Sequence, residues 1–419
     1  MAEDILLGDD FLRQLMSVGE VDLLVAIPTY NNAGTVVQAI QAIEDSYQQN
    51  FVRDRVVILN VDGGSTDHTT EAIVNMNGKK AGAHRGITSL RTVHRVTTQY
   101  GRTPSQGLAL RTVLAAADLL RARSCAMVSP ATTNLDPSWI ANLLKPAYRQ
   151  DFAFVAPLYA RSKFQGLLAR NLLYPMSRAV FGVRIREMYS DEWGFSGRLA
   201  THCLGQKLDE AVRARPEAWM AVTAICTGMK CCQSFLGPKA PPASGPDVVE
   251  AVRQTVGNLF WCFHNFQDHW LDRTGTEGVP TFGSDHELTP EDTPASQEKS
   301  FELFRSGVKD LDSVLSSILT PYTYGHLREI ASLEPEKFRY SAELWVRTLY
   351  EFAASYHRAT IARDHILQAL VPLYRGQLYS FLLEHGQSSA EEIEADSEAL
   401  CLEFERQKPY LIERWKAKS

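Results

Sequence analysis

Two groups of polar residues each follow directly on a run of apolar residues. The first group contains Pro28, Tyr30 and Asn31, and the second contains Asp62, Gly63 and Gly64. In an open α/β sheet, ligands bind where the parallel strands end. The carboxylate in the second group could accept a hydrogen bond from a ribose hydroxyl or a base N–H, and its glycines would let the backbone approach a ligand closely. The pattern predicts a nucleotide site.

Two neighbouring features are open to more than one interpretation. Ser65, Thr66 and Asp67 could face the ligand or could only cap the helix that follows them. Arg102 lies in a turn that opens a predicted helix, and a helix N-terminus with a basic residue favours a pyrophosphate. It could equally be an exposed loop arginine.

The elements that would position these residues alternate between apolar runs and helical patterns, which is typical of βαβ units and a mostly parallel sheet. The strands are expected at 23–27, 56–61, 90–93, 125–129 and 152–157. The helices between them are expected at 35–46, 69–76, 104–120 and 137–149, with a loop at 77–89. The fold class predicted for this half is α/β.

The rest of the chain reads mostly as helices. A helix is expected at 164–181, which we do not interpret as a membrane-surface helix because Pro175 would interrupt it. Further helices are expected at 219–228, 248–270, 301–319, 341–359, 364–384 and 390–407, with a strand at 230–235 and a loop at 321–326. We therefore predict a nucleotide-binding domain over 1–245 and a helical domain over 246–419, with a polar linker or lid at 271–299.

Composition narrows the class of protein. The 419 residues are 45% hydrophobic and 22% charged, as in ordinary globular proteins, and a net charge of −6 gives no general attraction to nucleic acid. Seven cysteines without a C-x-x-C pair argue against a zinc cluster or a disulfide framework, and the acidic residues near the N-terminus are unlike a secretory signal. The longest apolar stretch, 218–229, is too short to span a membrane. We expect a cytoplasmic protein.

The motifs Ile-Pro-Thr-Tyr-Asn-Asn at 27–32 and Asn-Val-Asp-Gly-Gly-Ser-Thr-Asp at 60–67 resemble those of GT-A fold glycosyltransferases of the family-two type. The resemblance implies a Rossmann-like domain that binds a nucleotide-sugar, such as a UDP- or GDP-sugar. It assigns that role to Pro28, Tyr30, Asn31, Asp62, Gly63, Gly64 and, more weakly, Arg102.

A narrower resemblance is to the retaining mannosylglycerate and glucosyl-phosphoglycerate synthases, through Ser-Asp-Glu-Trp-Gly-Phe-Ser-Gly at 190–197 and Leu-Gly-Pro-Lys at 236–239. It implies transfer of a sugar, with retention, to glycerate or 3-phosphoglycerate. Matched by position, Asp191, Glu192 and Glu217 would lie near the sugar and acceptor, and Ser129 and Lys239 near the donor. Glu217 could instead be only a first-turn helix glutamate.

This chain departs from those synthases where they bind Mg²⁺ or Mn²⁺. Ser129 and Ala131 replace the two acidic residues of the D-x-D motif, and Ala240 and prolines follow Lys239 where a histidine is expected. Since divalent cations need charged oxygen ligands, we expect no metal and a diphosphate held by Arg102, Arg186, Arg198 or Lys239. The alternative is a cation recruited by Asp191, Glu192 or histidines of the helical part.

The function predicted is therefore a metal-independent glycosyltransferase acting on a small hydroxy acid. The alternative is a pseudoenzyme, a nucleotide-binding or assembly module, which the lost metal ligands and the altered residues 190–191 favour. His264 and His269 are expected to pack in the core or at an interface rather than face a ligand. The apolar faces of the helical part could complete the acceptor pocket or form a homodimer interface.

Overall fold

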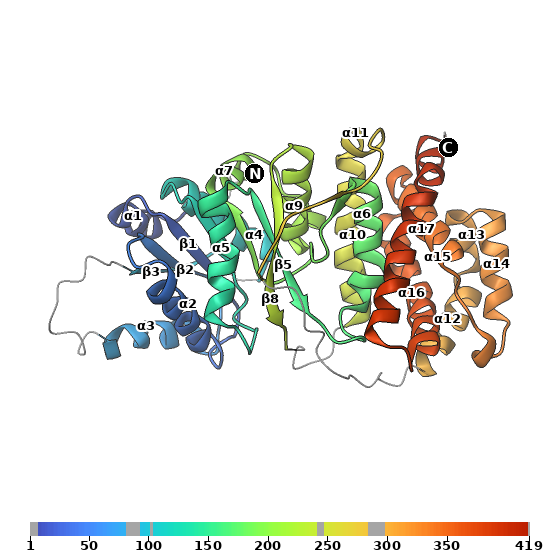
Figure 1. Ribbon diagram of the computed structural model, residues 1–419, viewed down its shortest axis with the longest axis horizontal. Coiled ribbons are helices and arrows are strands. Elements are labelled where there is room, and N and C mark those ends of the chain that lie inside the picture. The colour runs from blue at the N-terminus through green and yellow to red at the C-terminus, as the bar shows by residue number, and fades with distance from the viewer. Residues whose placement is uncertain (1–6, 81–92, 101–103, 241–246, 284–297, 418–419) are drawn as a thin grey trace. The chain divides into compact units, whose positions relative to one another are not determined.

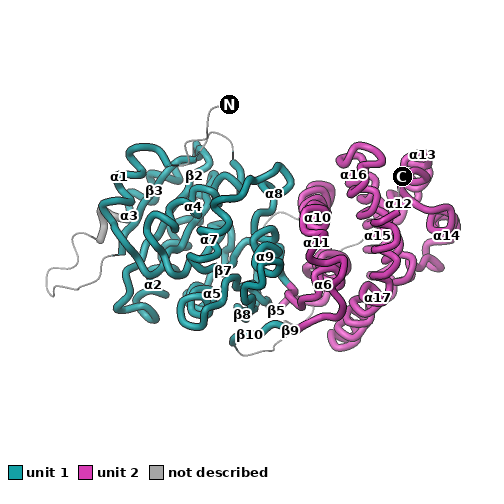
Figure 2. The backbone as a smooth tube through the Cα atoms, turned by 90° about the horizontal axis from the view of Figure 1, so that it is seen from above, with its two compact units in different colours: residues 1–160, 187–243, 279–287 teal, residues 161–186, 244–278, 288–419 magenta. Residues whose placement is uncertain are grey.

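The computed structural model describes residues 7–80, 93–100, 104–240, 247–283 and 298–417 (Figure 1). They form two compact units (Figure 2). Unit 1 draws on 1–160, 187–243 and 279–287, and unit 2 on 161–186, 244–278 and 288–419. Each unit is thus built from separate stretches of the chain. The division differs from a single boundary at 245/246, because residues 161–186 pack with helices from the end of the chain.

Unit 1 is built on an eight-stranded sheet with the strand order β10-β8-β5-β7-β4-β1-β2-β3. Its strands are β1 (Leu23–Thr29), β2 (Val56–Asp62), β3 (Val93–Gln99), β4 (Ser124–Met127), β5 (Phe154–Ala160), β7 (Trp193–Ser196), β8 (Cys231–Pro238) and β10 (Thr281–Phe282). All neighbours pair in parallel except β7, which runs antiparallel to both β4 and β5. The predicted α/β fold class is confirmed.

The strand expected at 90–93 can be compared with the structure only at Val93, because residues 90–92 lie outside the described part of the chain. β3 begins at Val93 and runs to Gln99, so the prediction missed residues 94–99. β3 lies at the edge of the sheet, where only Val96 of the strand is buried. An edge strand of this kind carries no continuous apolar run to reveal it.

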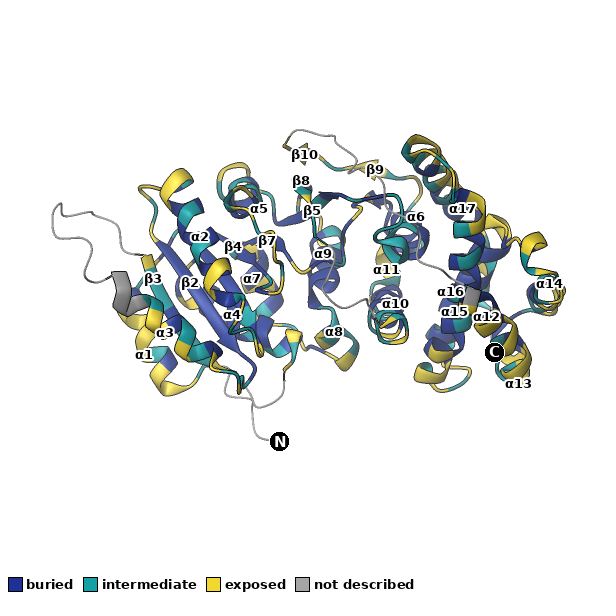
Figure 3. Cartoon of the chain, turned by 90° about the horizontal axis from the view of Figure 1, so that it is seen from below, coloured by how far each residue is buried: buried dark blue, intermediate teal, exposed yellow. Residues whose placement is uncertain are grey.

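Helices flank the sheet on both sides. They are α1 (Asp9–Val18), α2 (Val36–Asn50), α3 (Thr69–Lys80), α4 (Gln106–Leu119), α5 (Pro137–Gln150), α7 (Gly197–Leu204), α8 (Glu210–Ala214) and α9 (Pro216–Cys226). α2 and α5 cover one face, where Ile40, Ile43 and Leu143 pack against Ile27 and Ile58. Figure 3 shows the central strands buried and the outer turns of the helices exposed. This core holds the strand ends in place.

Unit 2 is mostly helical, as predicted for the C-terminal part. Its elements are the π-helix η1 (Ala169–Leu173), α6 (Tyr174–Phe181), β6 (Val183–Arg184), α10 (Val248–Asn265), α11 (Gln267–Trp270), β9 (Glu277–Gly278), α12 (Glu298–Asp310), α13 (Asp312–Ile318), α14 (Pro321–Ala331), the 3₁₀ helix η2 (Pro335–Lys337), α15 (Ala342–Arg358), α16 (Arg363–His385) and α17 (Ala390–Lys416). β6 and β9 form a small parallel pair. No described helix is both long and apolar enough to span a bilayer.

Three further predictions concern segments outside the sheet. The loop expected at 321–326 is wrong, because Pro321 opens α14 and the Thr320 hydroxyl caps it by accepting a hydrogen bond from the Thr323 amide. The segment 164–181 packs inside unit 2, where the fully buried Arg178 pairs with Glu398 and Glu405 of α17. Of the proposed linker or lid at 271–299, residues 284–297 lie outside the described part of the chain.

Candidate active site

The loops that follow β1 and β2 are joined to each other by hydrogen bonds. The Asn31 amide donates to the Ser65 hydroxyl at 2.9 Å, and the Thr66 amide donates to Asn31 Oδ1 at 2.9 Å. The Ala33 amide donates to Asp67 Oδ2 at 3.0 Å. The sheet therefore brings the two predicted motifs together at the carboxyl ends of neighbouring strands. Ser65, Thr66 and Asp67 join these loops in addition to leading into α3.

Asp62 is saturated by donors from the protein. Its Oδ1 accepts hydrogen bonds from the Thr29 hydroxyl at 2.8 Å and the Ser65 hydroxyl at 2.6 Å, and its Oδ2 accepts from the amides of Gly64 and Ser65 at 2.9 and 2.8 Å. The side chain is buried. A carboxylate has about four lone-pair positions, so in this structure Asp62 holds the loop and has little capacity for a ribose.

The local structure explains why both residues after Asp62 are glycines. Gly64 has a φ of 90°, which L side chains rarely adopt. A Cβ on Gly63 would lie 2.8 Å from the Tyr100 hydroxyl and 3.1 Å from Pro104 Cα. These positions shape the loop whether or not a ligand is bound. Of the first group of polar residues, Tyr30 is exposed and offers a ring for a base, whereas Pro28 is half-buried.

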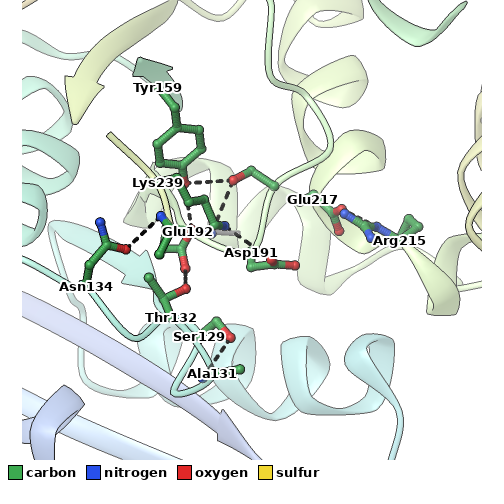
Figure 4. A network of polar contacts seen from close by, with 12 residues as sticks. Ser129, Ala131, Thr132, Asn134, Tyr159, Asp191, Glu192, Arg215, Glu217 and Lys239 are labelled. Carbon is green, nitrogen blue, oxygen red and sulfur yellow. Dashed lines mark hydrogen bonds and ion pairs between the residues drawn. The ribbon is translucent and has the colours of Figure 1, made fainter. Parts of the chain in front are cut away.

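A second cluster surrounds Glu192 (Figure 4). We call Thr132, Tyr159, Asp191, Glu192 and Lys239 the Glu192 cluster. The Tyr159 hydroxyl donates to Glu192 Oε2 at 2.6 Å, and the Thr132 hydroxyl donates to Oε1. Lys239 Nζ lies 2.7 Å from Glu192 Oε2. Glu192 is fully buried, so its charge is compensated by these three donors rather than by water.

Lys239 is shared between two carboxylates. Its Nζ lies 3.2 Å from Asp191 Oδ2, in addition to its contact with Glu192, and 5.0 Å from the centroid of the Tyr159 ring. The segment that carries it is fixed by Asn134, whose side chain donates to the Pro238 carbonyl at 2.7 Å and accepts from the Ala240 amide at 3.0 Å. The ammonium therefore lies at the end of β8, beside the loop that follows β4.

The two adjacent carboxylates differ in access. The Asp191 side chain is 49% exposed and the Glu192 side chain is 0% exposed. Burial raises the pKa of Tyr159 well above its usual value, and the negative charge of Glu192 raises it further, so the phenol remains a hydrogen-bond donor. Asp191 can touch a substrate, whereas Glu192 can only position Lys239 and Asp191.

Glu217 forms a buried ion pair at the start of α9. Arg215 Nε lies 2.6 Å from Glu217 Oε1, and the guanidinium lies over the Tyr189 ring. Burial raises the pKa of Glu217, against the opposing effect of Arg215. Figure 4 shows this pair next to Asp191, which also interacts with the charge of Arg215. Glu217 thus lies near the Glu192 cluster but is buried and paired with Arg215.

The structure does not place the other residues that were predicted to hold the diphosphate in the Glu192 cluster. Arg102 lies outside the described residues. Arg198 follows Ser196, which pairs with Ser124 at the start of β4, so it lies at the opposite edge of the sheet and cannot join this site. Arg186 pairs with Glu394 inside unit 2. Ser129 is half-buried, and its hydroxyl accepts the Ala131 amide at 3.2 Å within a turn.

The residues present do not fit a divalent metal ion. Ser129 and Ala131 offer no carboxylate, and Asp191 and Glu192 contact an ammonium that would repel a dication. Across the described ranges, no group of three or more His, Cys, Asp or Glu is arranged to hold a metal. The recruitment of a cation by Asp191 and Glu192 therefore has no structural support.

Several members of the site were missed from the sequence. Tyr159 is at the end of β5, a parallel strand, and this position could have indicated it. Arg215 precedes Pro216 and Glu217 at a helix start, a weaker signal. Thr132 and Asn134 lie in the turn after β4 and carry no signal in a single sequence.

Comparison with known proteins finds similarity to solved structures of glucosyl-3-phosphoglycerate synthase from Mycobacterium tuberculosis. A complex with Mn²⁺, UDP and phosphoglyceric acid has 18% sequence identity and a TM-score of 0.44, covering 62% of this chain and 83% of that chain. A complex with Mn²⁺, UDP-glucose and phosphoglyceric acid has 18% identity and a TM-score of 0.42, covering 60% and 82%. No family model and no curated protein matches the chain.

Proposed function

We propose that this protein is a glycosyltransferase that moves a sugar from a UDP- or GDP-sugar to a small hydroxy acid, such as D-glycerate or 3-phosphoglycerate, without a metal ion. The observation that carries the proposal is the Lys239 ammonium, held by buried Glu192 beside half-exposed Asp191 at the carboxyl edge of the sheet. Asp191 and Glu192 directly precede β7, and the nucleotide motifs follow β1 and β2, two and three strands away from β7, which is roughly 10 and 14 Å at the usual strand spacing.

In this proposal the positive charge for the departing diphosphate comes from Lys239. The ammonium exchanges its exposed partner Asp191 for a phosphate oxygen and keeps Glu192. The bond between the sugar C1 and the diphosphate oxygen breaks, and the acceptor hydroxyl oxygen bonds to C1. Because the anomeric configuration is retained, the acceptor attacks the same face of the sugar that the diphosphate leaves. The hydroxyl proton of the acceptor passes to the departing diphosphate.

The remaining residues bind or position. The exposed Tyr30 ring stacks on the base, and Asp191, once released from Lys239, orients the acceptor hydroxyl. Glu192 and Glu217 are positioning residues, because both are enclosed by protein donors. None of the seven cysteines, all of which lie in the described part of the chain, forms a disulfide, which supports a reducing cytoplasm.

One observation favours a second candidate, a nucleotide-binding module without catalysis. Asp62 is saturated by protein donors and Lys239 is already neutralised by two carboxylates, so neither is free without rearrangement. Such a protein would bind a nucleotide without breaking the sugar–phosphate bond.

The test is release of nucleoside diphosphate from UDP-, GDP- and ADP-sugars with D-glycerate or 3-phosphoglycerate, in excess chelator and again with Mg²⁺ or Mn²⁺. We expect turnover that survives the chelator. Lys239→Gln should lower kcat about a hundredfold, the effect of losing one preorganised charge in a transition state. The matched control is Lys230→Gln, because Lys230 is exposed at the other end of the same strand.

The other outcomes separate the alternatives. Nucleotide binding without turnover in any condition would favour the non-catalytic module. Turnover only with Mg²⁺ or Mn²⁺ would contradict the metal-independent reaction. An equal loss in the Lys230 and Lys239 variants would contradict a role for Lys239.

A further inference from the structure

Arg215 carries a second positive charge beside the Glu192 cluster, and the proposed function does not yet use it. Its guanidinium binds Glu217 through Nε alone, at 2.6 Å from Oε1. Its Nη1 and Nη2 make no hydrogen bond to any residue that the structure describes. Neither nitrogen is sealed from solvent, and the side chain is 18% exposed. The outer edge of the guanidinium can therefore receive a ligand.

The pairing with Glu217 is less than a purely structural ion pair would use. A guanidinium gains most from a carboxylate when it makes two parallel hydrogen bonds to it. Glu217 is buried, yet it accepts only one bond from Arg215, which leaves Nη1 and Nη2 as a planar fork of donors. This fork matches the two oxygens of a second carboxylate.

The guanidinium is held in place and stays charged. Glu217 fixes its Nε, and the centroid of the Tyr189 ring lies 5.9 Å from its Cζ. Burial alone would lower the pKa of Arg215, but the negative charges of Glu217 and Asp191 raise it above its usual value. The fork is thus a preorganised cation, which is what the recognition of an anion requires.

Asp191 connects this fork to the rest of the site. Figure 4 shows the Arg215 side chain extending toward Glu217 and Asp191. The Asp191 side chain is half-exposed, and its Oδ2 lies 3.2 Å from Lys239 Nζ. In the proposed reaction Lys239 takes the diphosphate and Asp191 orients the acceptor hydroxyl. A carboxylate bound to Arg215 would then belong to the same small molecule as that hydroxyl.

The local charge favours an acceptor with a single negative charge. The Glu192 cluster and the Arg215–Glu217 pair together carry three carboxylates and two cations. With Lys239 on the diphosphate, Arg215 is the cation of this group that is left for the acceptor. A phosphate monoester carries a charge of about −2 and would face the carboxylates of Asp191 and Glu217 as well. A carboxylate needs only the one cation.

We infer that Arg215 binds the carboxylate of the acceptor through Nη1 and Nη2 and so selects a 2-hydroxy acid over a neutral polyol or a phosphate ester. The inference rests on the proposed function, since it concerns the acceptor of that reaction. Arg215 is then a specificity-determining residue. A charge-assisted pair of this kind changes affinity by about tenfold to a hundredfold.

The test compares D-glycerate with two molecules that lack its carboxylate, the neutral D-glyceramide and the phosphate ester glycerol 3-phosphate. Calorimetric titration of the full chain in the presence of UDP or GDP should show that D-glycerate binds at least about tenfold more tightly than either. Arg215→Gln should lower the affinity for D-glycerate to that for D-glyceramide and leave D-glyceramide unchanged. An equal loss for both ligands would indicate a distorted site and overturn the inference, as would tighter binding of the phosphate ester by the parent.

A double variant separates ligand binding from the neutralisation of Glu217. With Arg215→Gln and Glu217→Gln combined, the cation and the buried negative charge are both removed. We expect D-glycerate to bind as weakly as it does to Arg215→Gln alone. Affinity restored to that of the parent would mean that Arg215 serves only Glu217. Arg213→Gln, at an exposed position two residues earlier, is the matched control and should bind as the parent does.

Binding and turnover are measured separately, so that the inference and the proposed function can fail separately. Binding of D-glycerate that depends on Arg215, without release of nucleoside diphosphate from any donor, would contradict the glycosyl transfer and support the inference. Transfer to D-glycerate with a KM that Arg215→Gln leaves unchanged would overturn the inference and support the transfer. No saturable binding of D-glycerate to the parent would also overturn the inference.

Discussion

Asp62 lies where the sequence predicts a ligand contact, but in the structure its carboxylate stabilises the loop around it. Four protein donors surround its carboxylate, two of them backbone amides. Asp62→Asn replaces one accepting oxygen with an NH₂ group that faces these donors. We expect a loss of about 1–3 kcal/mol in the free energy of unfolding, measured by urea denaturation, together with weaker nucleotide binding.

A second substitution separates the loop from direct contact. Ser65→Ala removes a donor to Asp62 and an acceptor for the Asn31 amide without touching the carboxylate. If Asp62 acts through the loop, both variants should lose nucleotide affinity. Asn75→Ala, at an exposed position of α3, is the control. Weaker binding in Asp62→Asn with normal binding in Ser65→Ala would instead indicate direct contact with the ligand.

The sequence could place such residues but not their partners. The position of Asp62 follows from the rule that polar residues at strand ends share one edge of a sheet, whereas Asp191 and Lys239 were placed by the resemblance to the synthases. Asp191 and Glu192 are neighbours in the chain, yet only one is exposed. Which of two successive side chains faces inward depends on what packs against them, here Tyr159 and Thr132 from distant segments.

At the scale of elements, glycines let α12 and α16 pack closely. A Cβ on Gly376 would lie 2.5 Å from the Phe304 ring, and one on Gly307 would overlap Pro372. Gly376→Ala should therefore lower the free energy of unfolding by about 1–3 kcal/mol, because the overlap outweighs the better helix propensity of alanine. Thermal unfolding of the variant measures this loss.

The matched control is a helical glycine with open space. Gly325 lies inside α14, and a Cβ there would meet nothing within 4 Å. Gly325→Ala should raise stability by about 0.5–1 kcal/mol. If both substitutions shift the midpoint in the same direction, close packing is not the reason for Gly376.

Helices and strands could be predicted where the pattern of their own residues is sufficient to identify them. The buried strands β1 and β2 consist of apolar runs, whereas the edge strand β3 has no such run. The start of α14 was missed, although Thr320 and Pro321 together fit a helix cap and a first helical position. Where a local sequence pattern is compatible with both a loop and a helix, packing with the rest of the protein determines which one forms.

For the whole molecule, the arrangement into two units depends on contacts between distant parts of the chain. Arg178 of α6 finds both its acidic partners in α17, more than two hundred residues later. Its burial was not predictable from residues 164–181 alone. Similarly, His264 was expected to pack in the protein, and its partner, His357 of α15, is far away in the sequence.

This histidine pair gives the molecule an acid-sensitive contact. His264 Nδ1 and His357 Nδ1 are 2.8 Å apart, and the His357 ring stacks on Trp415 with its centroid at 4.1 Å. Burial, then the neighbouring His264 and the positive charges of Arg358 and Arg363, lower the pKa of His357 to about 4. The unfolded value is about 6.5.

Between these two values the unfolded chain binds more protons than the folded one, so the free energy of unfolding falls as the pH is lowered from about 6.5 to about 4. For this partly exposed ring we expect a share of roughly 2 kcal/mol, less than full burial would give. Urea midpoints across this range should fall less steeply for His357→Gln than for the parent. His365→Gln, at an exposed position of α16, should keep the parent's slope. Since carboxylates contribute equally to all three proteins, identical slopes would show that the pair does not sense acid.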